Sequence, residues 1–455
     1  MRRVFNNRIF GVLVILVDLI LVYASIILAF EILRNSLVAL NDNYYAFTQV
    51  ALYIGIAYLL LAHIFELDKP KDFSFWGIAY SVTLSIIGLF CITMAFSFFA
   101  RVFAYPRSVL ILSSIFQVTS ITIWHWITNI MYRRENRKKS ILIIGKESAK
   151  ILAYKLIESN NMWSSIKHIC SPSNPRIKDY IEDCDLTFLT EDIDENEKQD
   201  IVRHCVELDK QVLYEPRNTE ILLFNANITQ VDDTPLLSVR PLGLQSANES
   251  TKRVMDVIVA SLGLIVFIIP STIVYLCLKI NGGTAFFVQE RVTRGGKIFK
   301  IYKFRTMIEN AEAKSGPMLA QDKDNRITRF GHFLRATRLD ETPQIFNILK
   351  GDMSIVGPRP ERPFFVEQFK QEIPEYELRH RVKAGLTGLA QIQGKYNTTV
   401  RDKLKYDLLY INGYSLALDI KLIMQTLNIL LRKSSTEGIK EAKDIESEIE
   451  KLYRD

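Results

Sequence analysis

Residues 252–280, KRVMDVIVASLGLIVFIIPSTIVYLCLKI, decide how this chain of 455 residues is organised. Their apolar run, 254–280, is long enough to cross a lipid bilayer as a helix, for which ~20 residues suffice. Pro270 interrupts the run, removes one helix hydrogen bond and forces a bend. Basic residues that suit a head-group region flank the run: Lys252, Arg253 and Lys279. The run is therefore either a bent helix that enters and leaves the same leaflet or a straight membrane span.

Four further apolar stretches precede this run and fill the first third of the chain. They cover about residues 10–33, 44–65, 75–99 and 108–131. Each has the length of a membrane-spanning helix, and four such blocks with so few charges argue against the alternative, a soluble helical core. We therefore expect four transmembrane helices within residues 1–133. Their polar exceptions, Asp18 and His125, are expected to bond between helices rather than to act in function.

The charges that flank these stretches predict their orientation. Lys and Arg residues precede the first stretch, lie between the second and third, and follow the fourth: Arg2, Arg3, Arg8, Lys69, Lys71, Arg133, Arg134, Arg137, Lys138 and Lys139. The link at Asn41–Asn43 carries none. By the positive-inside rule, both ends of this region lie in the cytoplasm. The first stretch is disfavoured as a cleaved signal peptide, because it is too long and no clear small-x-small site follows it.

Residues 139–245 alternate short apolar runs with helical patterns. The runs at 141–144, 166–170, 186–189 and 211–214 predict strands with helices between them. This alternation is typical of a parallel, Rossmann-like α/β unit. A dinucleotide site would need G-x-G-x-x-G after the first strand, but Gly145-Lys146-Glu147 offers one glycine and a carboxylate that repels phosphate. We therefore expect a degenerate domain with a structural or regulatory role.

The charge of the chain is unevenly distributed. The net charge of +7 combines the segment 252–433, which holds 29 Lys and Arg against 17 Asp and Glu, with a remainder that sums to −5. A basic region beside apolar segments suits nucleotide phosphates and acidic lipid head groups. No RNA- or DNA-binding motif occurs in the sequence, so nucleic acid is not an expected partner. Five scattered cysteines without C-x-x-C spacing indicate neither a zinc site nor a disulfide framework.

An adjacent carboxylate pair, Asp340-Glu341, is set among cations in the basic segment. These neighbours are Arg335, Arg338, Lys350, Arg359 and Arg362. One carboxylate can serve as a nucleophile and the other as a metal ligand, while the cations hold phosphate oxygens. Lys303 and Arg305, two apart on an expected strand, point to one face and can clamp phosphate as well. The alternative is a solvated helix surface whose basic residues bind acidic lipid.

Several motifs in this segment match one family in its own order. They are Lys252-Arg253-x-x-Asp256, Gln289-Glu290-Arg291, Tyr302-Lys303-Phe304-Arg305-Thr306-Met307, Leu339-Asp340-Glu341-x-Pro343-Gln344, Gly357-Pro358-Arg359-Pro360 and Lys383-x-Gly385-Leu386-Thr387-Gly388. On these residues the segment 252–433 resembles the bacterial sugar transferase family, the polyprenyl-phosphate phosphoglycosyl transferases with a re-entrant membrane helix. The upstream regions are similar to those of long-form members that start capsule or exopolysaccharide repeat units. The sequence departs from the residues common in the family at four positions. Ile269 replaces a serine, Thr342 a leucine, Ala384 a proline and Leu389 a tryptophan.

The resemblance implies a reaction in which a UDP-sugar and undecaprenyl phosphate give undecaprenyl-diphospho-sugar and UMP. By the same resemblance Asp340 is the nucleophile that forms a covalent phosphosugar intermediate, and Glu341 binds Mg²⁺. The matching phosphate- or substrate-binding residues are Lys303, Arg305, Arg335 and Arg359, with Arg338 and Arg362 as weaker candidates. These residues must reach cytoplasmic nucleotide, and a fifth crossing would place them outside the cell. Re-entry of 254–280 at Pro270 is therefore favoured over a straight span.

The sequence thus predicts a multidomain protein of a bacterial inner membrane. Its parts are a four-helix transmembrane bundle, a degenerate Rossmann-like α/β domain, a mainly helical monotopic phosphoglycosyl transferase domain and a charged tail, at residues 1–133, 139–245, 252–433 and 434–455. The catalytic domain is expected to face the cytoplasm and to contact membrane lipids. The sugar and the oligomeric state stay open, with a homodimer as one option. Two rival functions are a membrane scaffold or sensor with an inactive transferase domain, and a glycosyltransferase that releases UDP.

Overall fold

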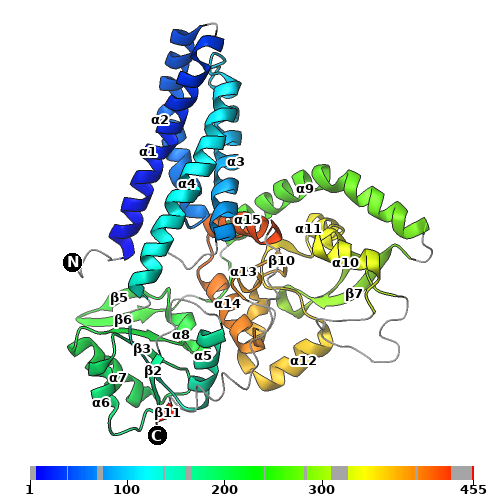
Figure 1. Ribbon diagram of the computed structural model, residues 1–455. Helices are drawn as coiled ribbons and strands as arrows, with labels where there is room; N and C mark the ends of the chain where they lie inside the picture. The colour runs from blue at the N-terminus through cyan, green and yellow to red at the C-terminus, as the bar shows by residue number, and fades with distance from the viewer. Residues whose placement is uncertain are drawn as a thin grey trace. The chain divides into compact units, whose positions relative to one another are not determined.

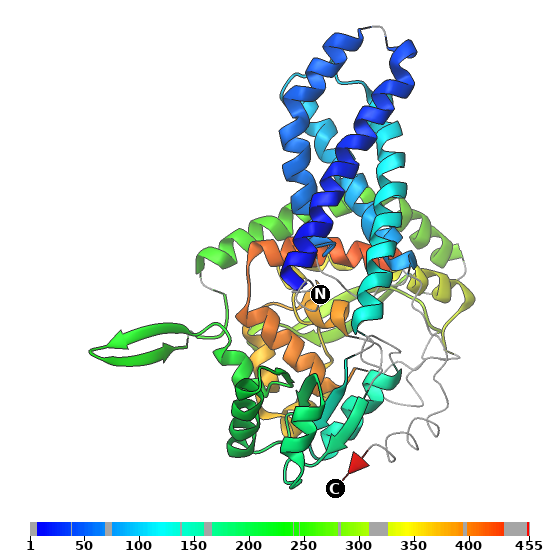
Figure 2. The same cartoon turned by 60° about the vertical axis from the view of Figure 1, so that its left-hand side comes forward.

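A computed structural model describes most of the chain, shown from two sides in Figures 1 and 2. The described residues are 7–37, 39–68, 75–136, 139–158, 166–239, 241–244, 246–280, 284–308, 326–394, 398–431 and 453–454. The chain divides into two compact units, Met1–Pro216 with Leu431–Asp455, and Arg217–Leu430. Each unit has hydrophobic core clusters of its own.

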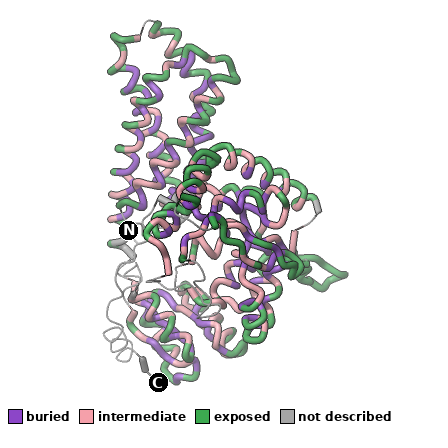
Figure 3. Tube along the Cα trace, turned by 90° about the vertical axis from the view of Figure 1, so that its right-hand side faces the viewer, coloured by how far each residue is buried: buried purple, intermediate pink, exposed green. Residues whose placement is uncertain are grey.

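Four long apolar helices begin the first unit. They are α1 (Asn7–Leu33), α2 (Leu40–Ile64), α3 (Phe75–Phe99) and α4 (Arg107–Asn136), with a 3-10 turn, η1 (Arg34–Ser36), after α1. α1 and α3 each pack against α2 and α4, and Figure 3 shows buried positions on their inner sides and exposed positions on their outer sides. In the interior, Asp18 Oδ2 lies 2.9 Å from both Tyr58 Oη and His125 Nε2. The two polar exceptions of the sequence are therefore paired between helices, as expected.

The rest of the first unit is a mixed α/β region around a parallel sheet. Its strands are β1 (Ile141–Ile144), β2 (Ile166–Cys170), β3 (Leu186–Leu189), β4 (Gln211–Tyr214) and β11 (Tyr453–Arg454), in the order β11-β2-β1-β3-β4. Its helices are α5 (Glu147–Glu158), α6 (Ile177–Asp183) and α7 (Glu195–Glu207). β1 is buried along its whole length, as a central parallel strand must be. The four predicted strands are confirmed; apart from β11, the predicted tail from residue 434 lies outside the described residues.

The second unit is built along one long helix, α9 (Ser246–Ile280). The helix continues through Pro270 and forms a curved ribbon in Figure 1. Together with α1–α4 it makes five helices, within the described part of the chain, that are long and apolar enough to cross a membrane. Little of the apolar surface of α9 is buried inside the protein. Five helices of this kind indicate a membrane protein.

Basic residues near the start of α9 fix it to the body of the second unit. Lys252 is buried, and its Nζ pairs with Asp419 at 2.5 Å. Arg253 donates to the carbonyls of Ile348 and Leu349 at 2.6 and 2.7 Å. These two carbonyls lie near the end of a short helix, α11 (Gln344–Lys350), and a cation at this end also suits the helix dipole. The basic start of the motif region thus has a structural role.

Two small sheets and several helices complete the second unit. The sheets are an antiparallel pair, β7 (Phe286–Val292) and β8 (Ile298–Phe304), joined by η2 (Arg294–Gly296), and a parallel pair, β9 (Ser354–Val356) and β10 (Gly385–Thr387). The other helices and turns are α10 (Arg329–Ala336), η3 (Leu339–Glu341), α12 (Pro363–Glu372), η4 (Pro374–Arg381), α13 (Leu389–Gln393), α14 (Val400–Asn412) and α15 (Leu416–Leu431). One core cluster joins α9, β8, α11, β9 and α14, so these elements position one another.

A hairpin outside this core also belongs to the second unit. It consists of β5 (Asn227–Val231) and β6 (Thr234–Ser238) and follows a short helix, α8 (Asn218–Leu223), that packs on α14. Every residue of both strands is exposed, and the hairpin projects in Figure 2. Apolar side chains such as Ile228 and Leu237 are among the exposed ones. These elements lie within the predicted range 139–245 but fall in the second unit.

Candidate active site

The predicted nucleophile and metal ligand lie in one tight turn, η3. Arg338, just before it, has a left-handed backbone with φ 57°, which is uncommon for a residue with a side chain. Asp340 and Glu341, the dyad, follow and are only 7% and 9% exposed. Because both carboxylates are buried, the alternative of a solvated helix surface does not apply to them.

The strand β8 brings Lys303 to the dyad. Antiparallel pairing with β7 sets Lys303 opposite Phe287, and its Nζ donates to Glu341 Oε1 at 2.7 Å. β8 ends one residue before Arg305, whose backbone N–H donates to Ala285 O at 2.9 Å. The structure thus places Lys303 against the dyad, and the phosphate-binding role of Arg305 stays a prediction.

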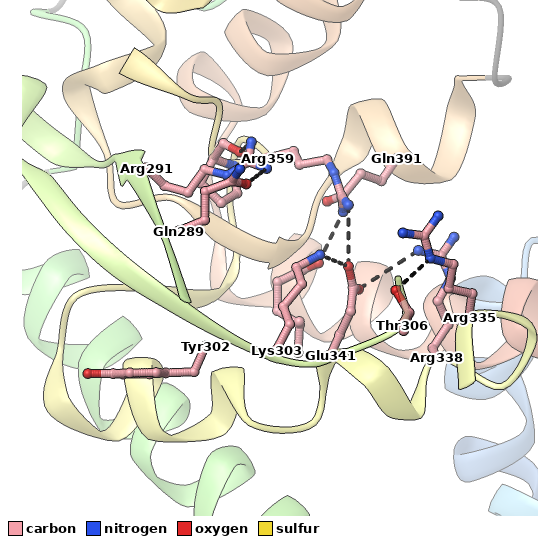
Figure 4. Close-up of polar contacts among 12 residues, drawn as sticks. Gln289, Arg291, Tyr302, Lys303, Thr306, Arg335, Arg338, Glu341, Arg359 and Gln391 are labelled. Carbon is pink, nitrogen blue, oxygen red and sulfur yellow. Dashed lines mark hydrogen bonds and ion pairs between the residues drawn. The ribbon is translucent and has the colours of Figure 1, made fainter. Parts of the chain in front are cut away.

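Glu341 is the centre of a cluster of ion pairs, drawn in Figure 4. Besides Lys303, Arg359 Nη2 lies 3.3 Å from Glu341 Oε1 and Arg338 Nη1 lies 3.8 Å from Oε2. Burial disfavours the ionised carboxylate. The charges of Lys303, Arg359 and Arg338 and the hydrogen bond from Lys303 outweigh this effect and hold the pKa of Glu341 well below its usual value. Glu341 is therefore ionised at neutral pH.

Asp340, the neighbour of Glu341, has a pKa that is shifted in the opposite direction. Burial and the negative charge of Glu341 raise the pKa of Asp340 above its usual value, although nearby cations act in the other direction. Its Oδ1 atom is buried and has no hydrogen-bond partner among the described residues. A buried acceptor without a donor is costly, and a ligand or reactant can complete such a site. Two carboxylates whose pKa values move apart suit two different chemical roles.

Two further predicted cations occupy different surroundings. Arg335 of α10 donates its Nε to Thr306 Oγ1 at 3.0 Å, as Figure 4 shows. Its charge also lowers the pKa of Asp340, so it acts on the dyad. Arg362 precedes α12, and its guanidinium lies over the ring of Phe365, 5.9 Å from the centroid. Four predicted cations therefore act on the dyad: Lys303, Arg335, Arg338 and Arg359.

A buried network that the sequence analysis missed holds Arg359. Arg379 of η4 donates to the Arg359 carbonyl at 2.9 Å and pairs with Asp407 of α14 at 2.8 Å. Arg379 and Asp407 are both buried. Gly357, in the same loop, leaves no room for a side chain, because a Cβ there would lie 2.5 Å from Lys383 O. No local spacing signals this network, since its members come from three separate segments.

A pocket opens beside the dyad. Its lining consists of Arg291, Ile301, Lys303, Glu341, Gln344, Arg359, Pro360 and Gly385. Gln344 is 3% exposed, and its Nε2 has no partner among the described residues. Gln344 and Arg291 lie within the family motifs, but the sequence predicts no role for either. A buried amide donor in a cationic pocket suits an acceptor such as a phosphate oxygen.

The dyad also fits the predicted Mg²⁺. In the part of the chain that the structure describes, no three His, Cys, Asp or Glu side chains cluster, so that part offers no all-protein cage. Mg²⁺ usually takes one or two carboxylates and completes its shell with water and substrate phosphates. The unpartnered Asp340 Oδ1 and the ionised Glu341 supply such oxygens. The residues present therefore fit an ion shared with phosphate.

A second possible anion site lies in the first unit, at the N-terminus of α5 after β1. Rossmann-type proteins bind phosphate at this position. Here Asp192 fills that position: it accepts the N–H groups of Lys146 and Ser148, at 3.3 and 2.9 Å, and the Thr190 hydroxyl. Burial opposes its charge, but these hydrogen bonds outweigh burial and lower the pKa of Asp192. A Cβ at Gly145 would collide with Thr190 Oγ1. This contact alone is enough to require glycine at position 145.

Comparison with known proteins gives matches that agree with one another. Residues 247–433 match the family model for bacterial sugar transferases. A UDP-N-acetylgalactosamine-undecaprenyl-phosphate N-acetylgalactosaminephosphotransferase of Aeromonas hydrophila is 43% identical over 185 residues, which are 40% of this chain and 43% of that protein. A UDP-glucose:undecaprenyl-phosphate glucose-1-phosphate transferase of Klebsiella pneumoniae is 37% identical over 242 residues, 51% of each chain.

A protein of the same name from Caulobacter vibrioides is 39% identical over 208 residues, which are 44% of this chain and 77% of that protein. The chain thus spans about half the length of the first two relatives and more than two thirds of the third.

Proposed function

The chain belongs to the bacterial sugar transferase family, and we propose that it transfers a sugar-1-phosphate from a UDP-sugar to undecaprenyl phosphate and releases UMP. The observation that carries this proposal is the dyad, two buried carboxylates with opposite pKa shifts under four cations. The names of the compared relatives support the same substrates. The product would begin a lipid-linked repeat unit of a capsule or exopolysaccharide.

Asp340 is the proposed nucleophile. Its carboxylate attacks the sugar-linked phosphorus of the UDP-sugar, the bond from that phosphorus to the bridging oxygen breaks, and UMP leaves with the bonding electrons. An oxygen of undecaprenyl phosphate then attacks the same phosphorus, the bond to Asp340 breaks, and the carboxylate is restored. The buried Oδ1 supports this role, because no described residue hydrogen-bonds to it.

Lys303 and Arg359 are the proposed ligands of the diphosphate. Both now pair with Glu341, and a substrate diphosphate carries more negative charge than one carboxylate, so it can draw both cations toward itself. Arg335 and Arg338 add positive charge beside Asp340. Phosphoryl transfer depends mainly on such positioning and charge neutralisation. Arg305 stays a predicted phosphate ligand and Arg362 a weaker one, and neither lines the pocket.

Glu341 is the proposed Mg²⁺ ligand, with Asp340 Oδ1 as a second candidate oxygen. When bound, the ion supplies charge neutralisation for the diphosphate and the leaving UMP. Glu341 is ready to bind the ion before it arrives. Its low pKa keeps the carboxylate ionised, and Lys303 and Arg359 hold the carboxylate in place.

The proposal includes a membrane arrangement. α1–α4 form a four-helix transmembrane bundle with both ends in the cytoplasm, and α9 re-enters the same leaflet at Pro270. The dyad then lies on the cytoplasmic side of a bacterial inner membrane. The proline inside α9, its curvature and its little-buried apolar surface support re-entry. Labelling of single cysteines introduced after residue 280 tests it, and reactivity from outside the cell would contradict it.

A homodimer is the proposed oligomeric state. The β5–β6 hairpin supports it, because both strands are exposed and carry apolar side chains, among them Ile228, Val231 and Leu237. An isolated two-stranded hairpin is marginally stable in water, and exposed strand edges pair readily. Light scattering on the full-length protein in detergent tests the proposal, and a monomeric mass would contradict it.

UMP release is the decisive test of the function. Membranes that contain the full-length protein receive undecaprenyl phosphate and a panel of UDP-sugars. UMP together with a lipid diphosphate sugar supports the proposal and identifies the sugar. UDP release would indicate the rival glycosyltransferase, and no product from any sugar would favour the scaffold or sensor.

A further inference from the structure

Thr342, one residue after the dyad, is part of a hydrogen-bond chain that starts on α9. Ser271 Oγ lies 3.0 Å from Thr342 Oγ1, and Thr342 Oγ1 donates to Leu339 O at 2.9 Å. A hydroxyl has one hydrogen to donate, and Thr342 uses it on Leu339. Ser271 is therefore the donor of the first bond. The two hydrogen bonds therefore point in one direction, from Ser271 of α9 through Thr342 to Leu339 of η3.

The turn that receives this chain has few bonds of its own. η3 is a single 3-10 turn, a form with poor hydrogen-bond geometry, and its bond from Thr342 N to Leu339 O is 3.3 Å long. The left-handed backbone of Arg338 before it is costly to maintain. The turn also carries two adjacent buried carboxylates that repel each other. Lys303 and Arg359 hold the Glu341 side chain, and a contact to the backbone of the turn adds a second kind of anchor.

α9 provides anchors along the whole segment that contains η3 and α11. At the far end, Arg253 donates to two carbonyls near the end of α11 at 2.6 and 2.7 Å. In the middle, α9 packs against α11, and Gly263 faces Ile345. At the near end, Ser271 follows Pro270, the residue at which α9 lacks a backbone N–H. The segment is thus attached to α9 at both ends and packed against it between them.

We propose that Ser271 and Thr342 form a positioning pair that fixes the dyad to the proline site of α9. Both are positioning residues, since they act through the backbone of η3. The pair would set the place of Asp340 relative to α9, and so relative to a polyprenyl phosphate at the lipid surface. In this last respect the inference rests on the proposed function.

The test uses the full-length protein in lipid nanodiscs, four single variants and the double variant Ser271→Ala/Thr342→Val. Ser271→Ala and Thr342→Val remove one hydroxyl each, and Thr342→Val keeps the shape of the side chain. Thr342→Ser is the conservative variant that keeps the hydroxyl. Thr272→Ala is the matched control, because Thr272 Oγ1 donates to Ile268 O within α9 and not to η3. Hydrogen exchange of residues 339–350 reports on the turn without any substrate, and UMP release gives kcat and KM.

Ser271→Ala and Thr342→Val are each expected to speed exchange of 339–350 and to lower kcat about fivefold, with KM for the UDP-sugar little changed. The double variant should be no worse than the poorer single variant, because both hydroxyls serve one chain. Thr342→Ser and Thr272→Ala should stay near wild type.

The positioning pair would be contradicted if the losses of kcat added up in the double variant. It would also be contradicted if neither single variant changed hydrogen exchange or kcat. Neither result would contradict the transferase function. If wild type released no UMP, the proposed function would fail, and faster exchange in both single variants would still support the pair as the anchor of η3.

Discussion

Two carboxylate sites in this molecule stand in contrast. At the N-terminus of α5, Asp192 receives two backbone N–H groups and a hydroxyl, and its pKa is lowered. In η3, Asp340 keeps a buried oxygen that no described residue satisfies, and its pKa is raised. The first site fills an anion position with a side chain of the protein. The second gathers four cations about two carboxylates and leaves positive charge for a substrate.

The difference shows how a carboxylate with a structural role can be told from one that leaves room for a ligand. Both sites lie where phosphate chemistry is expected, one after the first strand of a Rossmann-like sheet and one in a family motif. Satisfied hydrogen bonds indicate a structural role at Asp192. Unsatisfied polar atoms beside excess cations, Asp340 Oδ1 and Gln344 Nε2, indicate a place for a ligand.

The largest effect is expected from Asp340→Asn. The amide cannot form the covalent phosphosugar intermediate, so transfer should fall by roughly a thousandfold or more. The intact mass of wild type, given UDP-sugar without lipid acceptor, should increase by one sugar phosphate, and that of the variant should not. Asp192→Asn is the matched control and should transfer at the wild-type rate. Wild-type turnover by Asp340→Asn would remove the nucleophile assignment.

Glu341→Gln is expected to lower transfer about a hundredfold. The change removes a metal ligand and leaves Lys303 and Arg359 without their carboxylate partner. Chelation with EDTA should abolish wild-type transfer, Mg²⁺ should restore it, and the variant should need a higher Mg²⁺ concentration. Glu367→Gln, an exposed residue on α12, is the control. Transfer by wild type in EDTA at its full rate would contradict the metal role.

A smaller effect is expected in the pH profile. Asp340 must be ionised to attack, so kcat/KM falls as the pH drops through its pKa, which burial and Glu341 raise. Arg338→Ala removes a charge that lowers this pKa, so the acid limb should move to higher pH by a few tenths to about one unit. Lys350→Ala, whose Nζ pairs with Asp352 at 3.3 Å, should leave the limb unchanged. A shift to lower pH in Arg338→Ala would contradict the assignment.

Local pattern was enough to predict much of the fold. Uninterrupted apolar runs gave the positions of the long helices and of β1–β4, because length and periodicity fix both kinds of element. The dyad and four of the cations around it could also be predicted, because they lie in motifs that follow the order of the family. Gln344 and Arg291 show the limit: both line the pocket beside the dyad, but their motifs predicted no role for either.

Long-range pairings could not be predicted in this way. The carbonyl of Arg359 is held by Arg379 and, behind it, Asp407, and nothing in their spacing signals this contact. Asp192 likewise lies far along the chain from the helix N-terminus that it fills. The absence of a glycine-rich loop after the first strand could be read from the sequence. That the Asp192 carboxylate occupies the anion position at the N-terminus of α5 could not. Tertiary structure decides such contacts, because they depend on which segments the fold brings together.

The smallest effect is expected from Asp192→Ala, and it tests the structural side of the contrast. Loss of the carboxylate leaves the N–H groups of Lys146 and Ser148 without their acceptor, which should cost about 1 kcal/mol and lower Tm by a few degrees. The exposed N–H groups should then bind an anion, so millimolar phosphate should raise Tm of the variant more than that of wild type. Asp200→Ala, an exposed residue on α7, is the control and should gain no such response. Equal stabilisation of wild type by phosphate would mean that Asp192 does not fill the anion position, and the contrast with the dyad would fail.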